Sequence, residues 1–379
     1  MFRLLRYLRG EKMAIFTDVF EDVTKQGRKI PTSDYHVMGL HPIIDQGQSE
    51  IAGYTDEADG LFTDVPAIVF GDHTRVLKYV NTPCFLGADG VKLLKARIPN
   101  PNYKYLYYAL SSADIPNTGY NRHFKWLKEV NIPLPDADEQ QKIVDALDKV
   151  SELIGLRKEQ LAKLDQLVKS RFIELFGTIH DNKFGYEINT LQDVCEQIKD
   201  GTHQTPTYTD DSVNGYKFLS SKDVTTGKID WAHLKYIPEE LHNELYARIA
   251  PRKGDILLAK NGTTGIAAIV DRDEIFDIYV SLALLRPIEM NSVYLWAAIN
   301  SVETKQQFDS SLKGIGVPNL HLGEIKKAKI IVPPMGEQKR FAAFVEQTDK
   351  SKLAIQQSID KLELLKKSLM QEYFGRGEL

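Results

Sequence analysis

The sequence predicts an α+β protein made of two copies of one unit, in which a mixed domain of strands and short helices precedes a long helix. An internal repeat, proline-terminated apolar runs and a sevenfold apolar spacing predict this architecture. Matching residues recur 198 positions apart, as Glu139-Gln140 and Glu337-Gln338 do. A period of this length is that of a domain rather than of a solenoid repeat. We expect two antiparallel long helices, which form a coiled coil between two pseudo-twofold related domains.

The repeat keeps its register from the segment before each proline pair to the end of each long helix. An unbroken register of this kind does not arise by chance. The matching pairs are Asn121 and Asn319, His123 and His321, Ile132 and Ile330, Pro135 and Pro333, Lys169 and Lys367, Ser170 and Ser368, Glu174 and Glu372, Phe176 and Phe374, and Gly177 and Gly375.

At 379 residues the chain is too long for one ordinary hydrophobic core. Its first residues are basic and partly apolar, but they lack the apolar core of a secretory signal. A second methionine, Met13, raises the option that this leader is not native. The predicted segments are a leader at 1–12, a first domain at 13–135, a spacer helix at 136–177, a second domain at 178–334 and a second spacer helix at 335–379.

Each long helix begins where prolines stop a strand, because proline cannot donate to a sheet ladder. In the first copy Asp136 and Glu139 have the spacing of a capping box. The second copy has no such cap and carries Gly336 there. Gly177 and Gly375 stand where a helix C-terminus favours glycine.

Apolar residues recur every seven positions in both helices, which indicates a coiled coil. Each helix has one better row, and the companion rows are interrupted by arginine or lysine. We expect the two helices to pack against each other, although two amphipathic helices that each lie on their own domain would also fit. The expected packing residues are Leu147, Ile154, Leu161, Val168, Phe341, Ile355, Leu362 and Leu369.

Within the mixed domains, short apolar runs at 66–70 and 254–260 are bounded by turn residues and predict strands. The segments 102–110 and 293–300 predict short helices. Their aromatic residues favour a core position over an exposed stacking platform.

Several loops combine glycine, small polar residues and a basic residue. In 259–270, glycines would let backbone amides approach a phosphate, but a glycine-bearing hairpin explains the same residues. The segments 70–80, 117–127, 198–208 and 313–325 hold further candidates, although asparagine there also caps turns. The candidate DNA contacts are His73, Thr74, Arg75, Asn121, Arg122, Lys199, Thr202, His203, Gln204, Lys260, Asn261, Thr263, Thr264, Lys313 and Asn319.

Several function classes are disfavoured by what the sequence lacks. It has no phosphate-binding lysine loop, no dinucleotide fingerprint and no histidine pair with metal-ligand spacing. No apolar run is long enough for a membrane span, and two distant cysteines fit a reducing cytosol. A net charge of −4 argues mildly against a DNA binder that works without partners. We expect no enzymatic activity and no bound metal.

From about Met13 onward the chain resembles the specificity (S) subunit of type I restriction–modification systems. The resemblance is carried by the duplicated order of mixed domain, proline run and helix. The segments "IPLPDADEQQKIV" from Ile132 and "IIVPPMGEQKRFA" from Ile330 begin the helices. The segments "HPIIDQGQSEIAGYTDE" (41–57) and "DGTHQTPTY" (200–208) look like the openings of such domains.

The resemblance implies two target recognition domains, each of which reads one half of a bipartite site on double-stranded DNA. It implies helices that set the spacing and dock two methyltransferase (M) subunits, which motor–nuclease (R) subunits join. AdoMet, ATP and Mg²⁺ would bind to those partners, and the chain would be a cytoplasmic, non-catalytic specificity subunit. The alternatives are the specificity region of a fused methyltransferase or nuclease, and a coiled-coil scaffold without a DNA role.

Overall fold

The computed structural model describes residues 12–87, 89–210, 212–312 and 319–375. The chain divides into two compact units. Unit 1 comprises Met1–Lys158 and Gln357–Leu379, and unit 2 comprises Glu159–Gln356. Each unit therefore combines one mixed domain with parts of both long helices. The predicted domain boundaries stay a prediction, and the predicted leader lies outside the described residues except for Lys12.

Unit 1 contains three sheets and short helices around them. Its strands are β1 (Lys12–Ile15), β2 (Phe20–Asp22), β3 (His41–Ile44), β4 (Gly53–Thr55), β5 (Ala67–Gly71), β6 (Leu77–Val80), β7 (Phe85–Leu86), β8 (Val91–Ala96) and β9 (Asn131–Leu134). Its short helices are α2 (Phe16–Val19), α3 (Tyr103–Ser111) and α4 (Phe124–Leu127), with 3-10 turns at Thr24–Gln26 and Thr32–Asp34.

Unit 2 repeats this inventory and adds two helices, α7 and α9. Its strands are β10 (Glu187–Thr190), β11 (Cys195–Asp200), β12 (Tyr216–Leu219), β13 (Lys235–Ile237), β14 (Ile256–Ala259), β15 (Ala267–Ile269), β16 (Phe276–Ile278), β17 (Leu282–Pro287) and β18 (Lys329–Val332). Its short helices are α6 (Leu191–Val194), α7 (Glu239–Arg248), α8 (Ser292–Ile299), α9 (Val302–Ser311) and α10 (Leu322–Lys327), with a 3-10 turn at Ser221–Val224.

The strand order confirms the internal repeat. The larger sheets run β2-β8-β5-β6 in unit 1 and β11-β17-β14-β15 in unit 2. The three-stranded sheets run β4-β3-β7 and β13-β12-β16, and in each one the third-named strand pairs in parallel. The two-stranded sheets β1-β9 and β10-β18 correspond as well. The predicted strands and short helices lie where the apolar runs placed them, and the mixed helix and sheet class is confirmed.

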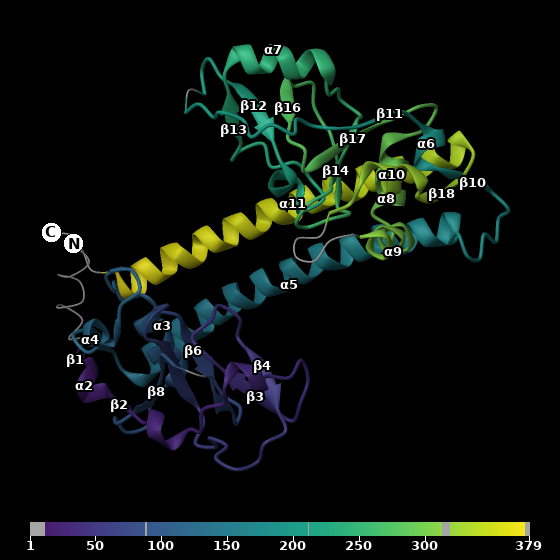
Figure 1. Cartoon of the computed structure of the whole chain (residues 1–379). Coiled ribbons are helices and arrows are strands. Elements are labelled where there is room, and N and C mark those ends of the chain that lie inside the picture. The colour runs from purple at the N-terminus through teal and green to yellow at the C-terminus, as the bar shows by residue number, and fades with distance from the viewer. Residues whose placement is uncertain (1–11, 88, 211, 313–318, 376–379) are drawn as a thin grey trace. The chain divides into compact units, whose positions relative to one another are not determined.

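The two long helices are α5 (Ala137–Phe176) and α11 (Met335–Phe374), drawn in teal and yellow in Figure 1. The amide of Glu139 donates to Asp136 Oδ1 at 2.8 Å, so the predicted cap forms. At the start of α11 the Glu337 amide donates instead to the Pro334 carbonyl at 2.9 Å. The repeated glutamines have the same role in both copies, because Gln140 Nε2 donates to the Pro135 carbonyl and Gln338 Nε2 donates to the equivalent Pro333 carbonyl, both at 2.8 Å. Among the helices of the described residues, none combines the length and hydropathy of a membrane span.

Both long helices contribute to the core of each unit. In unit 1 the start of α5, through Ile143 and Leu147, packs with the end of α11, where Phe374 lies 5.5 Å from the buried ring of Tyr105. In unit 2 the end of α5 packs with the start of α11. There Phe176 lies 4.8 Å from the buried Tyr294 ring.

The helices run antiparallel within each unit. In unit 2 Phe172 lies 5.5 Å from Phe341, and Lys352 pairs with Asp165 at 2.5 Å. In unit 1 Lys158 pairs with Glu363 at 3.0 Å. The expected packing of helix on helix is therefore present, and it is combined with packing on the domains. Of the expected packing residues, the fully buried ones are Leu147, Ile154, Val168 and Phe341, and the half-buried ones are Leu161, Ile355, Leu362 and Leu369.

We expect Phe374→Ala to destabilise unit 1 and Phe176→Ala to destabilise unit 2, each by about 3–5 kcal/mol, because each change removes a buried ring. Hydrogen exchange resolved by peptide would show which unit loses protection. Leu364→Ala is a matched control, because Leu364 is 69% exposed on α11. Equal loss of protection in both units after either change would contradict the division of the chain into two units.

Candidate nucleic-acid interface

In unit 1 the turn after β5 lies beside the segment that leads into α4. The His123 amide donates to the Asp72 carbonyl at 2.8 Å, and the Phe124 amide donates to Asp72 Oδ1 at 2.8 Å. His73 Nδ1 lies 3.2 Å from the Asn121 carbonyl. We call residues 72–75 and 117–123 loop cluster 1. The structure thus joins two segments that the sequence singled out separately.

Unit 2 joins the corresponding segments. The Leu320 amide donates to the Lys260 carbonyl at 2.9 Å, and Asn261 forms an antiparallel bridge with Asn319. The segment after β11 reaches the same place, because the Lys260 side chain pairs with Asp200. We call residues 200–204, 260–265 and 319–320 loop cluster 2. Each cluster lies at the end of a central strand of the larger sheet in its unit. This strand is β5 in unit 1 and the corresponding β14 in unit 2.

A buried carboxylate organises loop cluster 2. Asp200 Oδ2 accepts from Lys260 Nζ at 2.8 Å and lies 3.2 Å from His203 Nε2. Burial raises the pKa of Asp200, but the hydrogen bond and charge of Lys260 outweigh it, so that the pKa is lowered overall. Asp200 therefore remains ionised and holds the exposed His203 ring at the surface.

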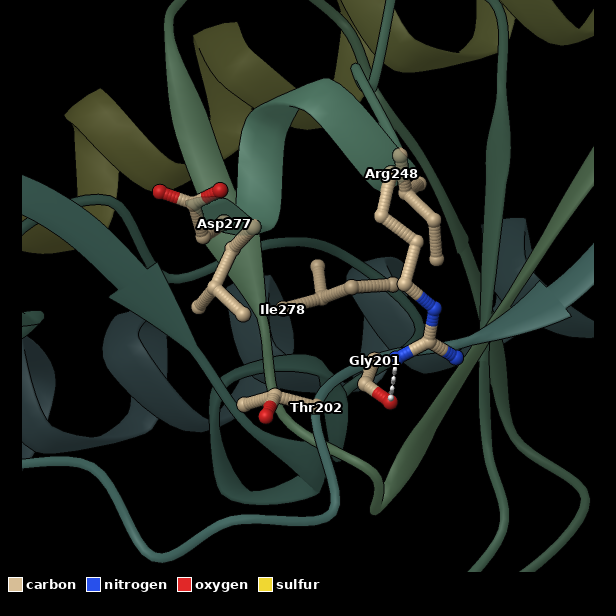
Figure 2. A pocket seen from close by; sticks show the side chains of 7 residues that line it. Gly201, Thr202, Arg248, Asp277 and Ile278 are labelled. Atoms are coloured by element: carbon tan, nitrogen blue, oxygen red, sulfur yellow. Dashed lines mark hydrogen bonds between the residues drawn. The ribbon is translucent and has the colours of Figure 1, made fainter. Parts of the chain in front are cut away.

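Arg248 joins this network from α7. Its Nη2 donates to the Asp200 carbonyl at 3.1 Å. Its Nη1 donates to the Gly201 carbonyl at 3.4 Å, as Figure 2 shows. Gly201 packs so closely that a Cβ there would lie 2.0 Å from the Ile278 carbonyl oxygen. The cavity beside these residues measures about 10 Å³, which is room for one water and not for a ligand.

A second buried polar pair joins α7 to β16. His242 Nδ1 lies 2.7 Å from Asp277 Oδ2, and Tyr216 stacks on His242 at 3.7 Å. Burial raises the pKa of Asp277 to about 6, partly offset by His242. Within the described residues no group of three His, Cys, Asp or Glu side chains could hold a metal ion.

The predicted contacts separate by exposure. Those exposed are Thr74, Asn121, Arg122, Lys199, His203, Gln204 and Thr263, and those half-buried are His73, Arg75, Asn261 and Asn319. Thr202, Lys260 and Thr264 are buried, and their role as DNA contacts stays a prediction. Arg75 also braces its own loop, since it donates to the Ile115 carbonyl at 3.0 Å. Lys313 lies outside the described residues.

Sequence reasoning missed Asp200, Arg248, Gln46 and Tyr120. Gln46 follows β3, and its carbonyl accepts from the Thr74 hydroxyl at 2.6 Å. Tyr120 is 86% exposed in loop cluster 1. Asp200 and Tyr120 both lie inside segments that the sequence had marked. The sequence therefore indicated where these residues lie in the chain, but it could not indicate that Asp200 is buried and paired or that Tyr120 is exposed and stacked.

We expect Lys260→Ala to lower the free energy of unfolding by about 3 kcal/mol at pH 7, because Asp200 loses its main buried partner. Since the folded-state pKa of Asp200 is lowered, this stabilisation is present above the unfolded-state pKa and is lost as the pH falls through the folded-state value. The difference from wild type should therefore shrink toward pH 3, as measured by urea unfolding.

Lys199→Ala, at an exposed neighbouring lysine, is the control and should be nearly neutral at both pH values. A Lys260→Ala deficit that is the same at both pH values would contradict the ion-pair explanation.

Among relatives, the chain is 26% identical over 292 residues to the type I restriction enzyme MjaVIII specificity subunit of Methanocaldococcus jannaschii, covering 70% of this chain and 68% of the relative. It is 23% identical over 355 residues to the EcoR124I/EcoR124II specificity subunit of Escherichia coli, covering 84% and 82%. Both relatives are named as specificity subunits.

Two solved structures share the fold. The type I restriction–modification S subunit of M. genitalium has a TM-score of 0.54 at 16% identity, and 97% of each chain is covered. A chain solved in work on assembly of the type I system has a TM-score of 0.57 at 18% identity, covering 97% and 98%. The family described as "Type I restriction modification DNA specificity domain" matches residues 13–166 and 184–364, which is most of the sequence. With its duplicated strand order and paired loop clusters, the chain belongs to this family of type I restriction–modification DNA specificity proteins.

Proposed function

We propose that this chain is the DNA-recognition subunit of a type I restriction–modification complex, in which each loop cluster reads one half of a bipartite site. One observation carries the proposal. Two units of the same strand order support equivalent loop pairs whose exposed residues differ. Identical scaffolds with different exposed side chains suit two different target sequences. The relatives are named for specificity rather than for a reaction, in keeping with a non-catalytic subunit.

The exposed residues of the clusters have the chemistry of base readout. Asparagine and glutamine pair with adenine, and arginine pairs with guanine, in the major groove. Asn121 and Arg122 stand exposed in loop cluster 1, and His203 and Gln204 in loop cluster 2.

The long helices suit both the spacing of the half-sites and the docking of two methyltransferase subunits. Leu167 and Leu365 occupy equivalent positions of the repeat and are 47% and 46% exposed, one in each unit. Two equivalent exposed apolar positions fit two copies of one partner. The proposal includes a pseudo-twofold relation between the units. The motor–nuclease subunits would join the complex of this chain with the methyltransferase subunits, and AdoMet, ATP and Mg²⁺ would bind to these partners. Such partners would also supply the positive charge that a chain of net charge −4 lacks.

The proposal is tested by sequencing the methylome of a host strain with and without this gene. We expect one bipartite methylated motif to disappear on deletion and to return on complementation. Complementation with Asn121→Ala and Arg122→Ala together should relax only one half of the motif, with His203→Ala and Gln204→Ala as the matched pair for the other half. No lost motif, or methyl transfer by the purified chain alone, would refute the proposal.

Removing seven residues of α5 between Val150 and Val168, together with the facing seven of α11 between Lys352 and Glu363, should shorten the required gap. Seven helical residues span about 10 Å, or about three base pairs. The measurement is the spacing of the methylated motif. Alanine-rich replacement of the same residues without deletion is the control for length. Unchanged spacing after the paired deletion would contradict the role of the helices as a ruler.

A further inference from the structure

The most exposed aromatic side chain of loop cluster 1 is Tyr120. It is 86% exposed, but its ring is held by a stacking contact. It lies over the His73 ring at a centroid distance of 4.5 Å and an interplanar angle of 7°. One face of the tyrosine is therefore covered by a parallel ring, and the other face is open.

His73 beneath it makes two hydrogen bonds, one from its ring and one from its backbone amide. Nδ1 faces the Asn121 carbonyl at 3.2 Å, and since a carbonyl only accepts, Nδ1 carries the proton. The His73 amide donates to Gln46 Oε1 at 3.2 Å. The base of the stacked pair is thus tied to two other segments of unit 1.

The turn that carries Tyr120 is ordered by its own polar groups. Gly119 has φ +75°, a conformation that glycine adopts without strain, and its amide donates to Asn117 Oδ1 at 3.2 Å. The Asn121 amide donates to the Gly119 carbonyl at 2.8 Å, and the Asn121 side chain donates to the Thr118 carbonyl. A ring held in this way loses little conformational entropy when it binds a partner.

Two cationic side chains follow Tyr120 closely in the chain. Arg122 is exposed two residues after it, and Lys125 is exposed on α4, where its Nζ lies 4.1 Å from the Trp126 ring centre. The acidic neighbour Asp72 is buried and accepts hydrogen bonds from the loop backbone. Cations beside an open aromatic face are the combination that binds nucleobases and their phosphates.

We propose that Tyr120, backed by His73, is a stacking platform that takes the planar face of one nucleobase at an opened step of the target duplex. This inference rests on the proposed function and adds a mode of contact that hydrogen-bond readout does not include. His73 is a positioning residue, because it acts through the ring it supports.

The test uses the assembled complex of this chain with its methyltransferase and duplexes that carry the motif found by methylome sequencing. A 2-aminopurine is placed at successive positions of the half-site that unit 1 reads. We expect its fluorescence to rise at one step with wild type and with Tyr120→Phe, but not with Tyr120→Ala. Affinity should fall about tenfold for Tyr120→Ala. The affinity of His73→Ala should lie between those of wild type and Tyr120→Ala.

Phe184→Ala is the matched control, because Phe184 is another exposed aromatic ring, at 46%, beside Tyr186 and Lys183 in unit 2. Specific binding that survives Tyr120→Ala with unchanged fluorescence would overturn this inference and leave the proposed function intact. Impaired methyltransferase assembly with Tyr120→Ala, at unchanged DNA affinity of the complexes that form, would assign the ring to a protein contact instead. Absence of any sequence preference in wild type would overturn the proposed function itself.

Discussion

The packing of each helix end against a buried tyrosine is the contact on which the rest of the structure depends. Phe176 ends α5 against Tyr294, and Phe374 ends α11 against Tyr105. Each tyrosine also donates its hydroxyl to the backbone of the strand before the next long helix, Tyr105 to Pro133 and Tyr294 to Ile331. One buried ring therefore joins the end of one helix to the strand that leads into the other helix. Unit 1 consequently needs the last turns of the chain to complete its core.

This arrangement makes the two units equivalent although only one of them is continuous in sequence. Unit 2 takes its helix segments from directly before and after its domain, whereas unit 1 takes one of them from the far end of the chain. The same pair of contacts closes both units. A constraint of this kind preserves the helix residues in both copies and leaves the loops of the domains free to differ.

The loop clusters are supported from beneath by buried polar groups of different chemistry. In unit 1 the Asp72 carboxylate and carbonyl accept hydrogen bonds from the segment before α4. In unit 2 the equivalent position is Lys260, whose carbonyl accepts from Leu320 and whose side chain neutralises Asp200. Buried polar groups are stable only when paired, so these pairs fix the loop backbones. Exposed side chains such as Arg122 and Gln204 then stand on a rigid base, as specific recognition of a defined surface requires.

The sequence by itself determined the repeat, the two long helices, the strands at 66–70 and 254–260 and the short helices at 102–110 and 293–300, because these follow from local periodicity, proline stops and turn residues. It also marked the two segments of loop cluster 1 and the three segments of loop cluster 2. What only the tertiary structure decided is which of the marked side chains are available. Lys260 looks like a surface group in a glycine-bearing loop, but it is buried, because it pairs with Asp200 from a distant part of the sequence. Thr264 in the same loop is buried as well. Tyr120 shows the reverse. An aromatic residue is expected in a core, but Tyr120 is exposed and stacks on His73, which lies 47 positions earlier in the chain. Burial and pairing depend on residues far apart in sequence, and no local pattern encodes them.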